Sequence, residues 1–292
     1  MILSTHSGNS VKLSKAGTVT RRLFLAGTSA VLVIVFFVFL LFKWEAVALA
    51  AEPAAAVVAE NRQTASVLLV TGIDHPAHNW RRTAPVLAEM LRKDTRLNVR
   101  IVEDPHFLDS SALRRYDVVV LHFMDWEQPA PGPKARANLQ KCVKDGRGLF
   151  VVHFACGAFQ DWPEFRNLAG RVWDPKARAH DPRGPFRVNI TNVSHPITKG
   201  LKSFETEDEL YTCLTGDRPV DMLATARSKV DGKNYPMAFA FDYGKGRVFH
   251  SALGHDVKAI SNPSAAELFR RGCAWAAGLT PVPETQNKNR GK

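Results

Sequence analysis

The sequence contains few cysteines, and none of them form a close pair. Its 292 residues include four cysteines, Cys142, Cys156, Cys213 and Cys273, with no CxxC motif among them. Three of the four lie in apolar or helical contexts. We therefore expect free, buried thiols and no disulfide framework.

The sequence also lacks a basic stripe interleaved with aromatic residues, although its formal net charge is +11. Residues 1–50 carry five lysines and arginines and one glutamate, a net +4, which leaves +7 for the remainder. These basic residues are scattered and fit no nucleic-acid-binding motif. They indicate ordinary solvated surfaces, and nucleic acid is not expected as a partner.

Charge is absent from Leu23 to Phe42, an apolar run of about 20 residues, which is long enough to cross a bilayer. The preceding TRRLFL, Thr20 to Leu25, fits a twin-arginine export signal, and Ala48 to Ala50 fits a leader-peptidase site. The alternative is an uncleaved membrane anchor. We expect export across a bacterial inner membrane to the periplasm, with the protein either soluble or anchored by residues 23–42.

From Ser66 onward, apolar strand patterns alternate with helical patterns, and there is no internal repeat. The expected strands are 66–72, 97–104, 118–126 and 148–155, and the expected helices between and after them are 80–94, a segment capped near Asp109, and 133–146. Added strands are expected at 185–192 and 209–214, a hairpin at 235–254 and a closing helix at 263–279. This order predicts an α/β fold with a mostly parallel sheet covered by helices.

Histidines follow several of the expected strands. His75, His122, His153, His250 and His255 come from four different strand ends, and His78 shares the first loop with His75. Ligands of open parallel sheets bind at the carboxyl ends of the strands, so we expect a shared pocket there. Any one of these histidines could instead be a buried structural residue.

Two chemistries fit such a pocket. Neutral imidazoles with a carboxylate form sites for zinc or a similar divalent metal. Imidazoles that titrate near neutral pH also serve as general acids and bases. The sequence has no HxH or HExxH motif, so its local metal signal is weak. The run Glu205 to Tyr211 is expected to be mostly a solvated turn, with Glu209 and Tyr211 pointing inward.

Six segments, taken in order, resemble the trehalose-utilisation ThuA-like family. They are TGIDHPAHNW, DVVVLHFMDW, GLFVVHFACGAF, NVSHPITKGL, DELY and GKGRVFHSALGHD, and they extend over residues 66 to about 279. The resemblance implies a flavodoxin-like three-layer sandwich similar to class I glutamine amidotransferases. It also implies a role in sugar metabolism, notably with disaccharides oxidised to keto forms. The expected organisation is a signal or anchor (1–50), a linker (51–64), a ThuA-like domain (65–280) and a polar tail (281–292).

Amidotransferases of this fold carry a nucleophilic cysteine in a sharp turn after a strand. Aligned on that pattern, Ala155 falls at the nucleophile position and Cys156 lies one residue late. The late strand ends in Phe249-His250-Ser251, without the partner histidine and glutamate of a thiol triad. We therefore expect that the chain is not a glutamine amidotransferase and that Cys156 packs in the core.

The resulting hypothesis is an enzyme that acts on a sugar or keto-sugar glycoside by isomerase, lyase or hydrolase chemistry. A non-catalytic carbohydrate-binding or accessory module is the alternative, and hydrolysis through Cys156 is a weaker one. The predicted catalytic residues are His75, His122, His153, Glu209 and His255, and the metal candidates among them are His75, His153 and His255. The predicted substrate-binding residues are Asp74, Trp80, Asp125, Trp126, Tyr211 and His250.

Overall fold

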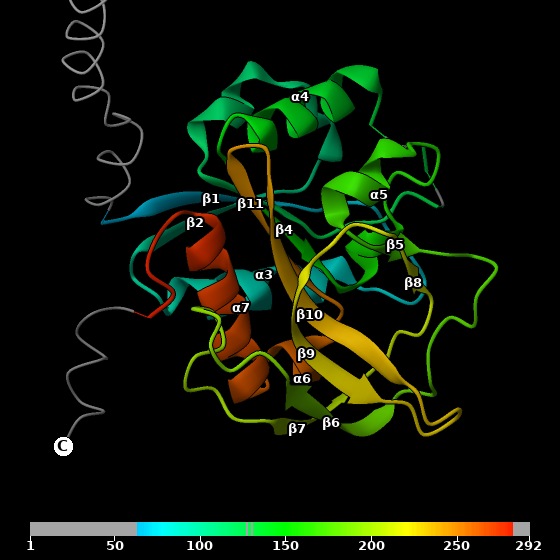
Figure 1. The fold of residues 1–292 in the computed structure, drawn as a ribbon. Coiled ribbons are helices and arrows are strands. Elements are labelled where there is room, and N and C mark those ends of the chain that lie inside the picture. The colour runs from blue at the N-terminus through cyan, green and yellow to red at the C-terminus, as the bar shows by residue number, and fades with distance from the viewer. Residues whose placement is uncertain (1–62, 127, 130, 283–292) are drawn as a thin grey trace, which may run out of the picture. The chain divides into compact units, whose positions relative to one another are not determined.

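A nine-stranded mixed sheet forms the centre of the domain (Figure 1). The structure is a computed structural model and describes residues 63–126, 128–129 and 131–282. The expected signal or anchor, most of the linker and most of the polar tail lie outside these residues. Within the described part of the chain, no helix is both long and apolar enough to cross a membrane.

Five strands of this sheet run parallel. They are β2 (Leu97–Val102), β1 (Ala65–Val70), β3 (Val118–Leu121), β4 (Gly148–Val152) and β11 (Gly246–Ser251), in that spatial order. All residues of β3 and β4 are buried, as expected for central strands with helices on both faces. The predicted α/β class with a mostly parallel sheet is confirmed for this half.

The other four strands extend the sheet in antiparallel steps. They are β10 (Asn234–Tyr243), β9 (Asp221–Arg227), β6 (Gly184–Ile190) and β7 (Phe204–Asp208). The β10–β11 hairpin matches the expected one. Four reversals of direction make β7 run the same way as β11, so both strands end at the same edge of the sheet. A short two-stranded sheet, β5 (Val172–Trp173) with β8 (Leu214–Thr215), lies outside the main one.

Helices cover both faces of the sheet (Figure 1). On one side lie α4 (Pro133–Lys144) and α5 (Glu164–Ala169); on the other lie α3 (Trp80–Arg92), α6 (Val257–Ile260) and α7 (Pro263–Ala276). Asparagine side chains cap α3 and α7: Asn79 accepts from the Arg82 N–H, and Asn262 accepts from the N–H groups of Ser264 and Ala265. The described chain also has three 3₁₀ segments: η1 (Pro105–Asp109), η2 (Ser111–Arg115) and η3 (His153–Gly157).

Four expectations need correction. The strand expected at 209–214 is reduced to an isolated bridge at Tyr211 and the first residue of β8. The strand expected at 118–126 ends at Leu121, because its parallel neighbour β1 ends opposite it at Val70. The segment near Asp109 forms two 3₁₀ turns instead of a helix. The acidic run expected to be a solvated turn is largely the edge strand β7, whose side chains alternate between inward and outward directions, with Thr206 and Asp208 buried.

The packing of α7 on β11 generates a test of the core. A Cβ atom at Gly272 would lie 2.2 Å from the ring of the buried Phe249. Replacing a helical glycine by alanine normally stabilises by about 1 kcal/mol, but overpacking a core costs about 1–3 kcal/mol. We expect Gly272→Ala to lower the free energy of unfolding, measured by denaturant titration.

Gly184→Ala provides the matched control, because a Cβ there meets only the Pro182 carbonyl oxygen, at 3.8 Å. It should leave the unfolding midpoint nearly unchanged. A Gly272→Ala protein as stable as this control would contradict the described packing of α7.

Candidate active site

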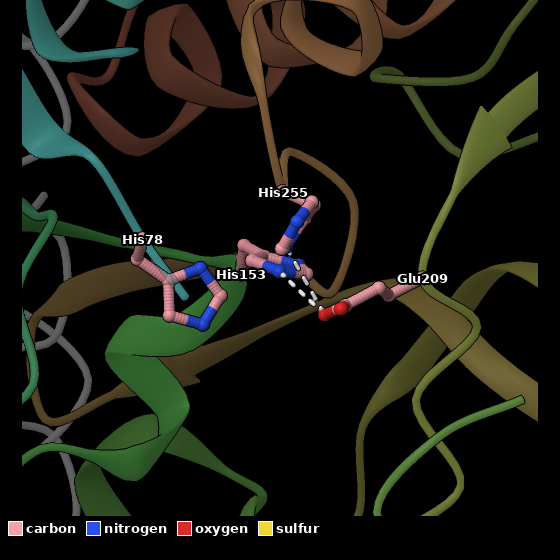
Figure 2. A group of neighbouring side chains, drawn as sticks. All are labelled: His78, His153, Glu209 and His255. Atoms are coloured by element: carbon pink, nitrogen blue, oxygen red, sulfur yellow. Dashed lines mark ion pairs between the residues drawn. The ribbon is translucent and has the colours of Figure 1, made fainter. Parts of the chain in front are cut away.

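Four side chains from separate strand ends meet at the carboxyl edge of the sheet (Figure 2). His78 lies in the loop after β1, His153 directly follows β4, and His255 follows β11. Glu209 directly follows β7. One nitrogen or oxygen atom from each residue lies within 4.8 Å of the others, and we call this group the histidine–glutamate cluster.

His153 occupies a strained backbone position. Its φ angle is +47°, in the left-handed region that costs most L-residues about 1–2 kcal/mol. Its ring nitrogen Nδ1 lies 2.7 Å from the carbonyl oxygen of Ala252, which can only accept a hydrogen bond. Nδ1 therefore carries the proton when the ring is neutral, and Nε2 keeps its lone pair. The Tyr211 hydroxyl, 2.8 Å away, donates to that lone pair.

The backbone strain at His153 corrects the expected position of the sharp strand-to-helix turn, called the elbow, that presents the nucleophile in amidotransferases. The motif pattern placed the nucleophile position at Ala155, but the residue held in the left-handed conformation directly after β4 is His153. In strand-to-helix elbows the strained residue presents its side chain to the site. A histidine thus takes the place that a nucleophile has in related folds.

Cys156 lies away from this presenting position. Its side chain is completely buried, and burial raises the pKa of the thiol well above its usual value, with Cys213 nearby adding to the shift. A thiol in this state is protonated at neutral pH and is a poor nucleophile. All four cysteines in the described chain are buried with free thiols.

Glu209 is the charged centre of the cluster. Its Oε2 lies 3.5 Å from His153 Nε2 and 3.2 Å from His255 Nδ1, while Oε1 lies 3.7 Å from His180 Nε2. Burial alone would raise the pKa of Glu209, but His153 and His255 outweigh it and lower that pKa below its usual range. Burial likewise opposes protonation of His255, but Glu209 outweighs it and raises the pKa of His255.

His78 is held as a neutral ring. It is 6% exposed, and its ring stacks on Phe154 with centroids 4.4 Å apart. Burial lowers the pKa of His78 to about 2, helped by the neighbouring His153 and His255. His78 can therefore offer a lone pair, and it is not a source of positive charge.

Asp208 positions two members of the cluster and was not anticipated from sequence. It is buried, and its carboxylate accepts hydrogen bonds from the backbone N–H groups of Glu209 (2.8 Å), Gly254 (2.8 Å) and His255 (3.1 Å). These bonds join the end of β7 to the loop after β11. The sequence offers one signal for the buried position of Asp208. It lies two residues after Thr206, and side chains two residues apart in a strand such as β7 point to the same side.

His180 was also missed, because it follows no strand of the main sheet. Its Nδ1 lies 2.7 Å from the Asp181 carbonyl oxygen, so Nδ1 donates and Nε2 keeps the lone pair that faces Glu209. The side chain is 33% exposed, so solvent and small molecules reach it. A bridge between the backbones of His180 and Tyr211 fixes its position.

Aromatic side chains border the cluster. The exposed Trp126 donates its indole N–H to the Gly157 carbonyl at 2.8 Å, and its ring contacts those of His75 and Trp173 edge-on. Trp173 in turn lies edge-on to Tyr211, 5.2 Å between centroids. Gly157 permits this arrangement, since a Cβ there would lie 3.1 Å from the Trp126 ring.

The other predicted site residues lie outside the cluster. His75 stacks on His78 at 5.4 Å, on the outer side, and is half-buried. His122 and His250 are completely buried; burial lowers their pKa values to about 3 and about 4, and their Nδ1 atoms face Thr71 and the Ala169 carbonyl respectively.

The remaining three predicted residues hold local structure. Trp80 is buried at the start of α3, and its indole N–H donates to the exposed Asp74 at 2.7 Å. Asp125 accepts the N–H of Phe159 at 3.0 Å, which ties the strand end after β3 to the segment after the elbow. Of the predicted residues, the structure thus brings together His153, Glu209, His255 and Tyr211.

Two hollows lie near the sheet edges. One, of about 410 Å³, reaches His255 between α3 and α6 and is lined in part by Asn79, Arg82 and Lys258. Another, of about 1240 Å³, borders Arg147 and Lys245, which precede β4 and β11. It therefore lies at the opposite edge from the cluster.

The fold and site define a class: three-layer α/β proteins with a histidine-rich centre at the carboxyl edge of the sheet. The family model for ThuA, described as trehalose utilisation, matches residues 66–276. The chain belongs to this family. Among curated proteins, no sequence is significantly similar to this chain.

Solved structures share the fold of this chain. A ThuA-like protein from Parabacteroides merdae is 26% identical with a TM-score of 0.67, covering 76% of this chain and 94% of its own. A ThuA-like protein from Bacteroides uniformis is 19% identical with a TM-score of 0.61, covering 80% and 98%. A β-galactosidase from Rahnella sp. R3 shares the fold over 79% of this chain and 34% of its own, with 16% identity and a TM-score of 0.51.

Asp208→Asn tests how the cluster is held together. The amide keeps the shape of the carboxylate, but its NH₂ group would face the backbone N–H of Gly254 or of Glu209 and His255. A buried donor without an acceptor costs about 1–3 kcal/mol. We expect a loss of this size in the free energy of unfolding, measured in denaturant.

Asp104→Asn serves as a control, because the Asp104 side chain is about 67% exposed. It should shift the free energy of unfolding by no more than a few tenths of a kcal/mol. An Asp208→Asn variant as stable as this control would show that the Asp208 contacts do not join the two strand ends.

Proposed function

We propose that the chain is an enzyme that transfers a proton at the carbon beside the carbonyl of a keto-sugar glycoside. The observation that carries the proposal is the histidine–glutamate cluster, next to an accessible imidazole, His180. Membership of a family described as trehalose utilisation supports a carbohydrate as the substrate. Trp126 supports it as well, because an exposed aromatic ring offers an apolar face on which a sugar ring can stack.

His180 has the geometry of a general base. Its Nδ1–H donates to the Asp181 carbonyl, which leaves the Nε2 lone pair free to take a proton. Once protonated, the ring would lie 3.7 Å from Glu209 Oε1, whose negative charge stabilises it. A base that is oriented by a backbone acceptor and backed by a carboxylate follows the usual arrangement of catalytic histidines.

The cluster supplies the complementary electrophile. The raised pKa of His255 favours its imidazolium form, which can hydrogen-bond a carbonyl oxygen and stabilise the negative charge that forms there. His180 takes the proton from the adjacent carbon, and the electron pair of that C–H bond forms an enolate. In an elimination, the enolate re-forms the carbonyl as the glycosidic bond on the next carbon breaks, and the departing oxygen takes the proton from His180. In an isomerisation, the former carbonyl carbon takes the proton from His180, while the hydroxyl on the deprotonated carbon gives its proton to the former carbonyl oxygen and becomes the new carbonyl.

A keto-glycoside assay with a His180→Ala variant tests this proposal. The substrates are a disaccharide oxidised to a ketone on one ring and the unoxidised disaccharide, trehalose. We expect the wild type to convert only the keto form, because only it has an acidic C–H bond. His180→Ala should lower kcat by about 10²- to 10⁴-fold, the usual contribution of a general base.

His106→Ala is the matched control, since His106 lies in η1 and is exposed. It should retain wild-type kcat. Binding of the keto-sugar without turnover by the wild type would indicate an accessory carbohydrate-binding module and contradict the enzymatic proposal. An unchanged kcat in the His180→Ala variant would show that His180 is not the general base.

A further inference from the structure

We propose that His78, His153, His255 and Glu209 form a binding site for one divalent transition-metal ion of the zinc type. The expectation from sequence placed His75 in such a site, but the structure places His78 there and adds Glu209. The proposal concerns binding and does not depend on the proposed function, because it is tested without any substrate.

The spacing of the ligand atoms fits a tetrahedral ion. Zinc binds imidazole nitrogen and carboxylate oxygen at about 2.0–2.2 Å, which places neighbouring ligands of a tetrahedron roughly 3.3–3.6 Å apart. Glu209 Oε2 lies 3.5 Å from His153 Nε2 and 3.2 Å from His255 Nδ1. With His78 included, all four atoms lie within 4.8 Å of one another, so small side-chain rotations complete the set.

The hydrogen bonds of His153 prepare it as a ligand. Metal-bound histidines usually donate their second ring N–H to a backbone carbonyl or a carboxylate, which fixes the tautomer. His153 does this through Nδ1 and Ala252. Its Nε2 accepts a hydrogen bond from the Tyr211 hydroxyl at 2.8 Å and lies 3.5 Å from Glu209 Oε2. A metal ion bound at Nε2 would displace the Tyr211 hydroxyl from this lone pair.

Two further nitrogens in the cluster have no hydrogen-bond partner among the described residues. They are Nδ1 of His78 and Nδ1 of His255, and both are buried. His255 Nδ1 lies close to Glu209 Oε2, but the two groups are not aligned for a hydrogen bond. Buried polar atoms are nearly always satisfied in folded proteins, so unpaired nitrogens on two residues of one cluster support a ligand there.

The surroundings hold these ligands in place before an ion binds. Phe154 stacks on the His78 ring, and Asp208 fixes the backbone at Glu209 and His255. A rigid, largely buried set of three imidazoles and one carboxylate suits zinc and neighbouring first-row metals. Calcium and magnesium prefer sites made of oxygen ligands.

The site is compatible with proton transfer by His180. Glu209 Oε2 faces the cluster, whereas Oε1 faces His180, so an ion on Oε2 leaves the other oxygen available. The ion would replace the proton on His255. Because the four side chains fill a tetrahedral shell, a substrate carbonyl would have to bind the ion as a fifth ligand in order to be polarised. His180 is not a ligand, which allows binding and activity to be separated by mutation.

Metal titration of the purified full-length chain tests the proposal. The protein is stripped with a chelator and titrated with Zn²⁺ and Co²⁺ by calorimetry, with elemental analysis of the loaded sample. We expect one ion per chain and, with Co²⁺, a visible absorption spectrum typical of tetrahedral nitrogen and oxygen ligands. His78→Ala and Glu209→Gln should weaken binding by at least 100-fold and abolish the spectrum.

His106→Ala and His180→Ala should bind like the wild type, and circular dichroism checks that every variant is folded. If a variant fails to fold, the wild-type stoichiometry and Co²⁺ spectrum still decide. A folded wild-type protein that binds neither ion would overturn the proposal, as would ligand variants that bind as tightly as the wild type. Metal binding with no turnover of keto-sugars would sustain this site and count only against the proposed function.

Discussion

The site depends on one hydrogen bond, from Nδ1 of His153 to the carbonyl of Ala252. It connects the ends of the neighbouring parallel strands β4 and β11, sets the tautomer of His153, and aims Nε2 at Tyr211 and Glu209. The left-handed backbone at His153 costs energy, and a position of this kind persists only where surrounding contacts determine it. Strain at one residue is thus used to present its side chain.

The carboxylates reach the site through the antiparallel half of the sheet. After four reversals of direction, β7 ends at the same edge as β11, and the Asn262 side chain ties the start of α7 to the Glu205 carbonyl of β7 at 2.9 Å. Asp208 then bonds the loop that carries His255, and Glu209 follows it into the cluster. The added strands therefore complete the site, in addition to enlarging the core.

Much of the fold follows from local sequence patterns. Continuous apolar runs such as that of β4 predict buried parallel strands. The rule that ligands bind at the carboxyl ends of strands pointed to one edge of the sheet, where the structure brings His153, Glu209 and His255 together. His153 and His255 could be placed there because His153 directly follows β4 and His255 lies in the loop after β11. The hairpin of β10 and β11 was predicted because its turn glycines separate two apolar runs.

The details of the site were harder to predict from the sequence, for physical reasons. His75 and His78 lie three residues apart in one loop, and only the backbone path of that loop decides which ring faces inward. The elbow residue was placed at Ala155 because a motif frame cannot reveal which residue takes a positive φ angle. Asp208 and His180 act through long-range contacts, with the loop after β11 and with Glu209, that no local pattern records.

The central claim is that residues from four strand ends form one centre that binds a cation. The most direct measurement is an anomalous difference map from crystals of the protein soaked in Zn²⁺, recorded at the zinc absorption edge. The account predicts one strong peak within about 2.0–2.2 Å of nitrogen atoms of His78, His153 and His255 and of Glu209 Oε2. A map with no peak at the cluster, or with zinc only at surface histidines such as His106, would contradict it.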